Sequence, residues 1–425
     1  MRILVLGNNY APEQTGIGPF TTGLCEDLAA RGHRVAVITA RPSYPEWRVR
    51  DGYRGFMYKK ERLNGVSVQR VWHYVPRRPS SLVQRLAHDL SFTLGGFLAG
   101  MLAGEFDVIY CCCPPPTLGL AAYVLGKIHR KPYIMKLADL ASDAALATGI
   151  LKDGWLVRLA RGLESLVYSK AHKVVCLCQG FVDKLVSRGI PQDRLHLIPD
   201  WADTQRVYPI ANATAFRRAN NLSLGQFLVL HSGNMGKKQD LMNVVRAAEL
   251  SRSMPEIVWL LVGNGEERAF IAEEIGRRNI ANVKLLPLQP ADSLAEMYSA
   301  ADVLLLNQKD GVQDAVIPSK LLTYMAAGRA VIAAVNERSE AARQVRAARC
   351  GLIAPAESPD ALLRSVLALR ESATLRQEFG RNGRAYADLN FTKQKVLDEY
   401  EIIFNSYKSE KATSPKLSEE SAAVQ

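Results

Sequence analysis

Short apolar runs alternate with amphipathic stretches along almost the whole chain, in two separate series. Strand-like runs separated by helix-length stretches are typical of parallel sheets wrapped by helices. At 425 residues the chain is also too long for one ordinary hydrophobic core. We therefore predict an α/β protein with two doubly wound, Rossmann-like parallel-sheet domains. The expected strands lie at residues 2–7, 34–39, 66–72, 106–112, 133–137, 173–177 and 195–199, and then at 227–232, 258–262, 283–286, 302–306, 330–335 and 351–354.

A polar stretch at residues 200–221, which contains Pro209, separates the two series. We place the first domain at residues 1–205 and the second at residues 206–391, followed by a last helix at 392–407. Residues 408–425 are polar and contain no aromatic side chain, so we expect a disordered tail.

The formal net charge of +12 is concentrated early in the chain. Residues 41–88 contain eleven Arg and Lys residues against three acidic residues, a local net charge of +8, together with seven Tyr, Trp and Phe residues. Basic and aromatic side chains together suit an anionic lipid surface, because rings settle at the headgroup level while cations meet phosphates. They also suit single-stranded nucleic acid, and an ordinary solvated basic face is the third interpretation.

The cysteines and the chain start indicate a cytoplasmic protein. The seven cysteines form no CxxC pair and most lie in apolar runs, which favours reduced thiols over disulfides or a zinc site. Met1 leads directly into the first strand-like run, so we expect no signal peptide. The apolar run at residues 90–104 is too short and too rich in glycine to span a bilayer.

The segment after the strand expected at 302–306 has the features of a phosphate site. Pro318, Ser319 and Lys320 should open a helix that ends at Gly328, with Pro318 in the first turn and Ser319 capping the free amides. Gly328 suits the left-handed position after a helix. Free amides and a lysine at a helix start can hold a phosphate, although an ordinary strand–helix junction is the alternative.

Other loops after strands add chemistry of the same kind, because ligands of open α/β sheets bind beyond the carboxyl ends of the strands. After the first strand of the chain, Gly16 and Gly18 permit close backbone approach of a ligand at a helix start. In the second series, Gly233, Asn234, Lys237 and Lys238 follow the first strand, and Gly263 and Gly265 follow the next. Each of these two loops is a weak signal alone, but together with Ser319 and Lys320 they give three loops on one face of one domain, which favours a phosphate-bearing ligand.

Several catalytic motifs are absent from the sequence. It contains no Asp-x-Asp metal–diphosphate motif, no Gly-x-Ser-x-Gly and no HExxH. Asp139 and Asp143 are spaced to share one face of a helix, with capping and solvation as the alternative interpretation.

The segments IPSKLLTYMAAGRAVIA, HSGNMGKKQ, IPDWAD and NNYAPEQTGIG resemble the family 4 glycosyltransferases of GT-B fold, and most closely the bacterial exopolysaccharide enzymes of the colanic-acid fucosyltransferase type. The resemblance extends over residues 2–407. It implies two Rossmann-like domains facing across a cleft, with the acceptor on the first, a GDP- or UDP-linked sugar on the second, and the last helix crossing back to the first domain. It also implies metal-independent transfer with retention of configuration and no cofactor.

The implied activity is a hexosyltransferase-type transfer of a sugar, such as fucose or a related one, to a polyprenyl-diphosphate-linked acceptor in exopolysaccharide or O-antigen biosynthesis. The enzyme would be peripheral on the inner face of the cytoplasmic membrane, with no nucleic-acid partner. Carried over to this sequence, the resemblance implies catalytic roles for Lys320, Lys238 and Asp143, donor binding by Gly16, Gly18, Gly233, Asn234, Lys237, Gly263, Gly265, Leu288, Asp314 and Ser319, and an acceptor-side role for Asp139.

The sequence departs from the family pattern where a pair of glutamates commonly holds the ribose. The first glutamate position is Ala315, beside Asp314, and the second is Thr323. A non-catalytic GT-B scaffold of a polysaccharide-assembly complex is therefore an alternative, as is a soluble glycosyltransferase with a small acceptor.

Overall fold

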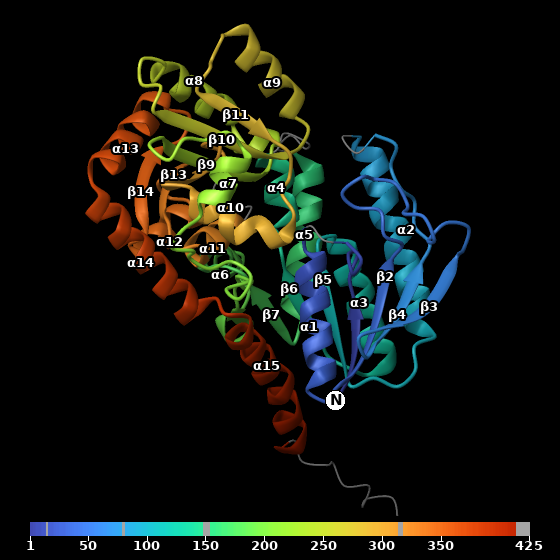
Figure 1. Ribbon diagram of the computed structural model, residues 1–425. Helices are drawn as coiled ribbons and strands as arrows, with labels where there is room; N and C mark the ends of the chain where they lie inside the picture. Colours follow the sequence, from blue (N-terminus) through green and yellow to red (C-terminus); the bar gives the residue numbers. More distant parts are fainter. Residues whose placement is uncertain (14–15, 79–80, 148–153, 313–317, 414–425) are drawn as a thin grey trace, which may run out of the picture.

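The computed structural model describes residues 1–13, 16–78, 81–147, 154–312 and 318–413, and it folds into two α/β units (Figure 1). Each unit is built on a largely parallel sheet with helices on its faces, so the fold class predicted from the alternation is confirmed. Strands that are covered on both faces are buried throughout, which is why they read in the sequence as continuous apolar runs.

The first sheet has eight strands in the described part of the chain, in the order β3-β4-β2-β1-β5-β6-β7-β8. All neighbours are parallel except β3 and β4. The strands are β1 (Arg2–Leu6), β2 (Arg34–Ala40), β3 (Tyr58–Leu63), β4 (Val66–Val71), β5 (Val108–Cys113), β6 (Tyr133–Leu137), β7 (Lys173–Cys176) and β8 (Leu195–Leu197). Its helices are α1 (Gly18–Ala30), α2 (Leu82–Met101), α3 (Pro116–His129), α4 (Ala141–Ala147), α5 (Trp155–Lys170), α6 (Gln179–Ser187) and the short η1 (Gln192–Arg194).

One strand was not predicted: β3 has the sequence YKKERL and lies inside the basic segment. This strand is at the edge of the sheet and none of its six residues is fully buried. An edge strand needs no apolar run, and lysines on it block pairing with other chains. The missed strand therefore shows that part of the basic segment is regular sheet.

The second sheet has six parallel strands among the described residues, in the order β11-β10-β9-β12-β13-β14. This is the doubly wound order in which the winding reverses between the first and fourth strands, here β9 and β12. The strands are β9 (Phe227–Asn234), β10 (Ile257–Asn264), β11 (Val283–Leu286), β12 (Val303–Asn307), β13 (Ala330–Val335) and β14 (Gly351–Pro355). Around them lie α7 (Thr214–Ala219), η2 (Lys237–Gln239), α8 (Leu241–Leu250), α9 (Arg268–Arg277), η3 (Ala291–Ser293), α10 (Leu294–Ala300), α11 (Ser319–Ala326), α12 (Glu340–Ala348), α13 (Pro359–Glu371) and α14 (Ala373–Asn390).

The last helix, α15 (Lys393–Thr413), runs back onto the first unit (Figure 1). Its residues Leu397, Tyr400 and Phe404 are buried in the same apolar cluster as Ile3 and Val5 of β1. The helix is longer than the expected span of 392–407, so the first six residues assigned to the tail are helical. The rest of that segment, residues 414–425, lies outside the described residues.

Polar contacts connect the two units where the chain passes between them. The buried Lys136 on β6 forms an ion pair of 2.6 Å with Asp200, the first residue of the polar stretch between the two strand series. The next residue but one, Ala202, donates its backbone N–H to the carbonyl of Phe391 at 2.8 Å, just before α15. The two crossings of the chain are thus held side by side. The domain limits at residues 205 and 391 remain a prediction.

Candidate active site

The carboxyl ends of β9 and β12 lie side by side in the second sheet and bring several candidate residues together. The winding of the sheet reverses here, so the loops that follow the two strands diverge and leave room for a ligand. His231 and Gly233 belong to the end of β9, Lys238 and Gln239 belong to η2, and Lys320 lies in the first turn of α11. We refer to these five residues as the switch-point cluster.

Lys320 is the centre of this cluster. Its Nζ donates to Gln239 Oε1 at 3.0 Å and lies 3.4 Å from His231 Nε2. A Cβ added to Gly233 would lie 3.4 Å from the same Nζ, so the glycine leaves the space that the lysine occupies. Burial lowers the pKa of Lys320 to about 7, because the charged form loses hydration.

His231 is fully buried behind Lys320. Burial, and then the charge of Lys320, lower the pKa of His231 well below its usual value. The imidazole is therefore neutral at physiological pH, and its Nε2 can accept a hydrogen bond from the Lys320 ammonium. Neither His231 nor Gln239 was predicted to have a role, although both lie in the segment HSGNMGKKQ. Their closeness in sequence to Lys238 was the available signal.

The η2 turn that carries Lys238 is fixed from below by a buried asparagine. Asn307, the last residue of β12, donates its side-chain amide to the backbone carbonyls of Gln239 at 2.7 Å and Asp240 at 2.9 Å. Asn243 in turn donates to Asn307 Oδ1 at 2.8 Å. The backbone carbonyl of Lys238 also accepts from Lys309 N at 3.0 Å. These hydrogen bonds tie the backbone of η2 to the end of β12, so Lys238 and Gln239 lie on a rigid turn.

The start of α11 differs in one respect from the sequence prediction. Pro318 occupies the N-cap position and Ser319 is the first helical residue, and no side-chain hydrogen bond from the described residues caps the turn. The prediction that Ser319 caps the helix was therefore wrong, because Ser319 is one position inside the helix and its side chain is exposed. The prediction for Gly328 is confirmed, since its φ is +64° directly after the helix.

Gly263 and Gly265 have a packing reason independent of any ligand. Gly263 pairs with Gly233 in the neighbouring strand, and a Cβ on it would lie 1.9 Å from the Gly233 carbonyl oxygen. A Cβ on Gly265 would lie 2.6 Å from the carbonyl oxygen of Met235. The two glycines allow the loops after β9 and β10 to touch, which forms the wall of the switch-point cluster.

Asp139 brings the first unit to this cluster. It follows β6, and burial raises its pKa to about 6, with the charge of Lys238 as the strongest opposing effect. The two side chains therefore interact although they belong to different units. Asp139 Oδ1 is buried and has no hydrogen-bond partner among the described residues. A carboxyl group in this state can accept a hydrogen bond from an incoming hydroxyl.

Asp143 does not share this position. It lies in α4, which begins at Ala141, so Asp139 precedes the helix and the expected shared helical face is wrong. Asp143 instead forms ion pairs with Arg188 at 2.9 Å, Arg161 at 3.2 Å and Lys184 at 3.3 Å. These three ion pairs join α4 to α5 and α6, so Asp143 stabilises the packing of these helices. This structural role argues against the catalytic role expected for it.

Gly16 and Gly18 lie at the carboxyl end of β1 in the first unit. Gly16 has a φ of +64° and packs against the ring of Tyr44, and Gly18 is the first residue of α1. The loop is fixed by the buried Glu13, which accepts from the backbone N–H groups of Ser43 at 2.8 Å and Tyr44 at 2.9 Å. The nearest atoms to a Cβ built on Gly16 belong to Tyr44, and those nearest to one on Gly18 belong to Glu13 and Asn9, so both glycines are accounted for by packing within the first unit.

The other expected donor-binding residues are exposed or lie outside the described residues. Asn234 is exposed at the end of β9, Lys237 is exposed on η2, and Leu288 is 59% exposed after β11. Asp314 lies outside the described residues. Among those that are described, no group of three or more His, Cys, Asp or Glu side chains is arranged to hold a metal ion.

Comparison with known proteins identifies the class to which this fold and cluster belong. Residues 15–201 match the glycosyl transferase 4-like domain, and residues 212–386 match the glycosyl transferases group 1 family. The chain therefore belongs to the family 4 glycosyltransferases of group 1, enzymes of GT-B fold. The resemblance predicted from the sequence is confirmed.

The alignments with individual relatives cover nearly the whole chain. The Escherichia coli (strain K12) protein WcaI, whose assigned name is that of a colanic acid biosynthesis glycosyl transferase, is 32% identical over 407 residues, which is 94% of this chain and 98% of WcaI. Sucrose-phosphate synthase from Thermosynechococcus elongatus has the same fold, with a TM-score of 0.75, 18% identity and coverage of 96% and 99% of the two chains. Anabaena Alr3699/HepE in complex with UDP gives a TM-score of 0.71, 16% identity and coverage of 96% and 100%.

Proposed function

We propose that this enzyme transfers a sugar from a nucleotide-sugar donor to a polyprenyl-diphosphate-linked acceptor in exopolysaccharide biosynthesis of the colanic-acid type. The observation that carries the proposal is the switch-point cluster, where Lys320 and the Lys238 turn meet at one strand edge opposite Asp139. The 32% identity to WcaI over almost the full length supports the pathway class.

The cluster suits the charge changes of glycosyl transfer. When the bond between the anomeric carbon and the phosphate oxygen breaks, negative charge builds up on the diphosphate and positive charge on the sugar ring. Lys320, Lys238 and the free amides of α11 would stabilise the leaving diphosphate more strongly in the transition state than in the substrate. Lys320, with its pKa lowered to about 7, would take up a proton when the diphosphate enters, because the anion favours the ammonium form.

Asp139 would orient the acceptor hydroxyl toward the anomeric carbon. As the new carbon–oxygen bond forms, the hydroxyl proton passes to the departing phosphate oxygen, so that the same face of the sugar is attacked and vacated. This retaining course needs no carboxylate nucleophile close to the sugar, unlike a retaining glycosidase. Asp139 then acts through hydrogen bonding to the acceptor, which is the role its unpaired Oδ1 supports.

The proposed donor is a UDP- or GDP-linked sugar, and the complex of the structural neighbour HepE with UDP supports the first of these. We expect isothermal titration to detect one of the two nucleoside diphosphates and its sugar derivative, with binding at least ~10-fold weaker in Lys320→Ala. Arg364→Ala, which removes an exposed cation on α13 of the same unit, is the matched control. The proposal would be contradicted if neither the UDP nor the GDP compounds bound. Binding without transfer or hydrolysis would instead favour the non-catalytic scaffold.

The lipid-linked acceptor implies contact with a membrane, and α2 offers a suitable surface. Leu86, Leu90, Leu94 and Leu98 are 49–60% exposed and recur every four residues, so they form one apolar stripe along the helix. An exposed apolar stripe beside basic side chains is typical of a helix lying in a membrane interface. Within the described chain, none of the helices combines the length and the apolar character that crossing a bilayer requires.

Sedimentation with vesicles tests this contact. We expect anionic vesicles to bind the protein at low salt and high salt to release it, because screening weakens attraction to the headgroups. The pair Leu94→Ser and Leu98→Ser should abolish binding, while Leu250→Ser, an exposed leucine at the end of α8 in the other unit, should not. Full recovery of the wild-type protein in the supernatant at low salt would rule out the membrane part.

A further inference from the structure

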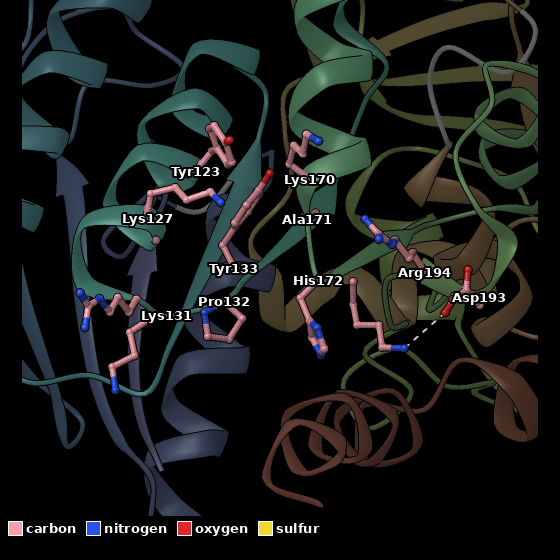
Figure 2. Close-up of a pocket in the computed structure, with 13 residues that line it drawn as sticks. Tyr123, Lys127, Lys131, Pro132, Tyr133, Lys170, Ala171, His172, Asp193 and Arg194 are labelled. Atoms are coloured by element: carbon pink, nitrogen blue, oxygen red, sulfur yellow. Dashed lines mark hydrogen bonds between the residues drawn. The ribbon is translucent and has the colours of Figure 1, made fainter. Parts of the chain in front are cut away.

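A second candidate binding site lies in the first unit, at the amino ends of β6 and β7. A pocket of about 630 Å³ opens where α3 and α5 end and where β6 and β7 begin (Figure 2). Tyr133 at the start of β6 lines it, whereas Asp139 follows the other end of that strand. Since β6 has five residues, roughly 17 Å of strand separates the pocket from Asp139.

The pocket is lined mainly by cationic side chains. Figure 2 shows Tyr123 and Lys127 of α3 on one side, Lys170 and Arg194 on the other, and Tyr133 between them. In the described part of the chain, none of its lysines and arginines makes an ion pair of 4.0 Å or less with a carboxylate. The lining comprises six basic residues (Lys127, Arg130, Lys131, Lys170, Lys173 and Arg194), together with His172, against one acidic residue, Asp193.

The few polar contacts of these cations are to backbone oxygens. Lys173 Nζ donates to the carbonyl oxygen of Asp193 at 3.3 Å, and Arg194 donates to that of Ser169. Lys131 is close enough to Asp107 to lower its pKa, but Asp107 is already paired with Arg2 at 2.9 Å. The positive charge in the pocket is therefore left largely uncompensated by the protein.

Capping of helix ends explains only part of this charge. Lys127 and Lys170 lie in the last turns of α3 and α5, where cations complement the helix dipole. Arg130, Lys131, Lys173 and Arg194 lie beyond these helices. The Gly126 carbonyl at the end of α3 already accepts from Lys131 N at 2.8 Å, so it does not need a side-chain cation. Six like charges gathered around a single acidic residue disfavour the folded state, which argues for a ligand that neutralises them.

We propose that this pocket binds a phosphate-class anion, such as a phosphate or diphosphate ester. The Tyr133 hydroxyl donates to the carbonyl of Val167 at 2.5 Å, which fixes one wall of the pocket. Lys127 Nζ lies 5.8 Å from the centre of the Tyr123 ring, where it remains available to an anion. The same chemistry would recognise either a soluble phosphate ester or the headgroup of an anionic lipid. The inference does not depend on the proposed sugar transfer.

Histidine signals in NMR can report on the two sites separately. His172 lines the pocket, whereas His231 contacts Lys320 in the switch-point cluster. We would label the seven histidines with ¹³C at Cε1 and assign their signals by single His→Gln variants. Inorganic phosphate and pyrophosphate are then titrated into the full-length protein. We expect a saturable shift of the His172 signal, and a shift of the His231 signal reports independently on the donor site.

Charge removal provides the matched comparison. Lys127→Gln with Lys170→Gln removes two exposed cations of the pocket and should weaken the His172 response about 10-fold or more. Arg364→Gln with Arg381→Gln removes two exposed cations of the second unit and should leave the response unchanged.

Vesicles containing phosphatidylglycerol distinguish the two sources of phosphate. If the pocket binds a lipid headgroup, the Lys127→Gln and Lys170→Gln pair should also lose vesicle binding. If the ligand is a soluble ester, vesicle binding should persist while the phosphate response is lost. The proposal would be overturned if neither phosphate nor pyrophosphate moved the His172 signal up to millimolar concentration and the variant bound vesicles like the wild type.

Discussion

Replacing Lys320 with methionine should make the protein more stable and the enzyme much less active. Lys320 is held in a desolvated position by Gln239 and His231, where its pKa falls from the ordinary lysine value of 10.5 to about 7. Methionine has a similar length and carries no charge, so it removes the cost of burying an ammonium group. The opposite signs of the two effects identify a residue kept for function at the expense of stability.

The size of the stability effect can be worked out from the pKa. The full difference corresponds to about 5 kcal/mol, at roughly 1.4 kcal/mol per pKa unit. We expect Lys320→Met to recover about 2 kcal/mol, because the variant also leaves Gln239 Oε1 without its donor. For a cooperative unit of about 150–250 residues this is a rise of roughly 4–8 °C in Tm. The expected loss of transfer rate is about 10²–10³-fold, typical of removing one group that stabilises a leaving anion.

The same pKa difference predicts how the stability of the wild type changes with pH. Well below pH 7 Lys320 is protonated in both states, and the folded state carries the full cost of the desolvated cation. Between pH 7 and 10.5 the unfolded chain binds more protons than the folded one, so wild-type stability rises with pH. The advantage of Lys320→Met over the wild type should therefore be largest below pH 7 and shrink as the pH increases toward 10.5.

Thermal unfolding at pH 6 and pH 9 provides the measurement, with transfer or nucleotide binding assayed on the same samples. Arg364→Met is the control, because it removes an exposed cation on α13 of the same unit. A Tm difference between Lys320→Met and the wild type that is absent, or constant with pH, would refute the burial argument. Unchanged nucleotide binding would refute the role in the donor site.

Three further substitutions separate catalytic from structural roles. We expect wild-type activity to rise with pH through a pKa of about 6 in pH–rate profiles, and Asp139→Asn should remove this rise. Asp143→Asn should lower the free energy of unfolding by about 1–2 kcal/mol in denaturant, because it breaks ion pairs with cations such as Arg188. Nucleotide affinity should stay unchanged, and a reduced affinity would instead support a role for Asp143 in the active site. Gly263→Ala should lower the free energy of unfolding by more than ~2 kcal/mol, because its Cβ would meet the Gly233 carbonyl. The control is Gly276→Ala on α9, where a Cβ has no atom within 4 Å, and it should be neutral or stabilising in the same assay.

The loops with phosphate chemistry were predictable because each is a local pattern at the end of an apolar strand. Lys320 and Lys238 were both found this way. Asp139 and Asp143 could not be ranked from their spacing, since their roles depend on cations from α5 and α6 and on Lys238 from the other unit. The edge strand β3 escaped prediction for a similar reason, because an exposed strand has no apolar run to reveal it.

The class of fold follows from the local pattern of residues, because continuous apolar runs and helix-length spacers leave few alternatives to parallel sheets covered on both faces. The same pattern shows which side chains are available near the strand ends. Which of these side chains meet depends on how the distant segments pack. Gln239 and Lys320 are 81 residues apart in the chain and come into contact because β12 pairs with β9. Burial, which sets the pKa values of Lys320 and Asp139, likewise arises from the packing of distant segments.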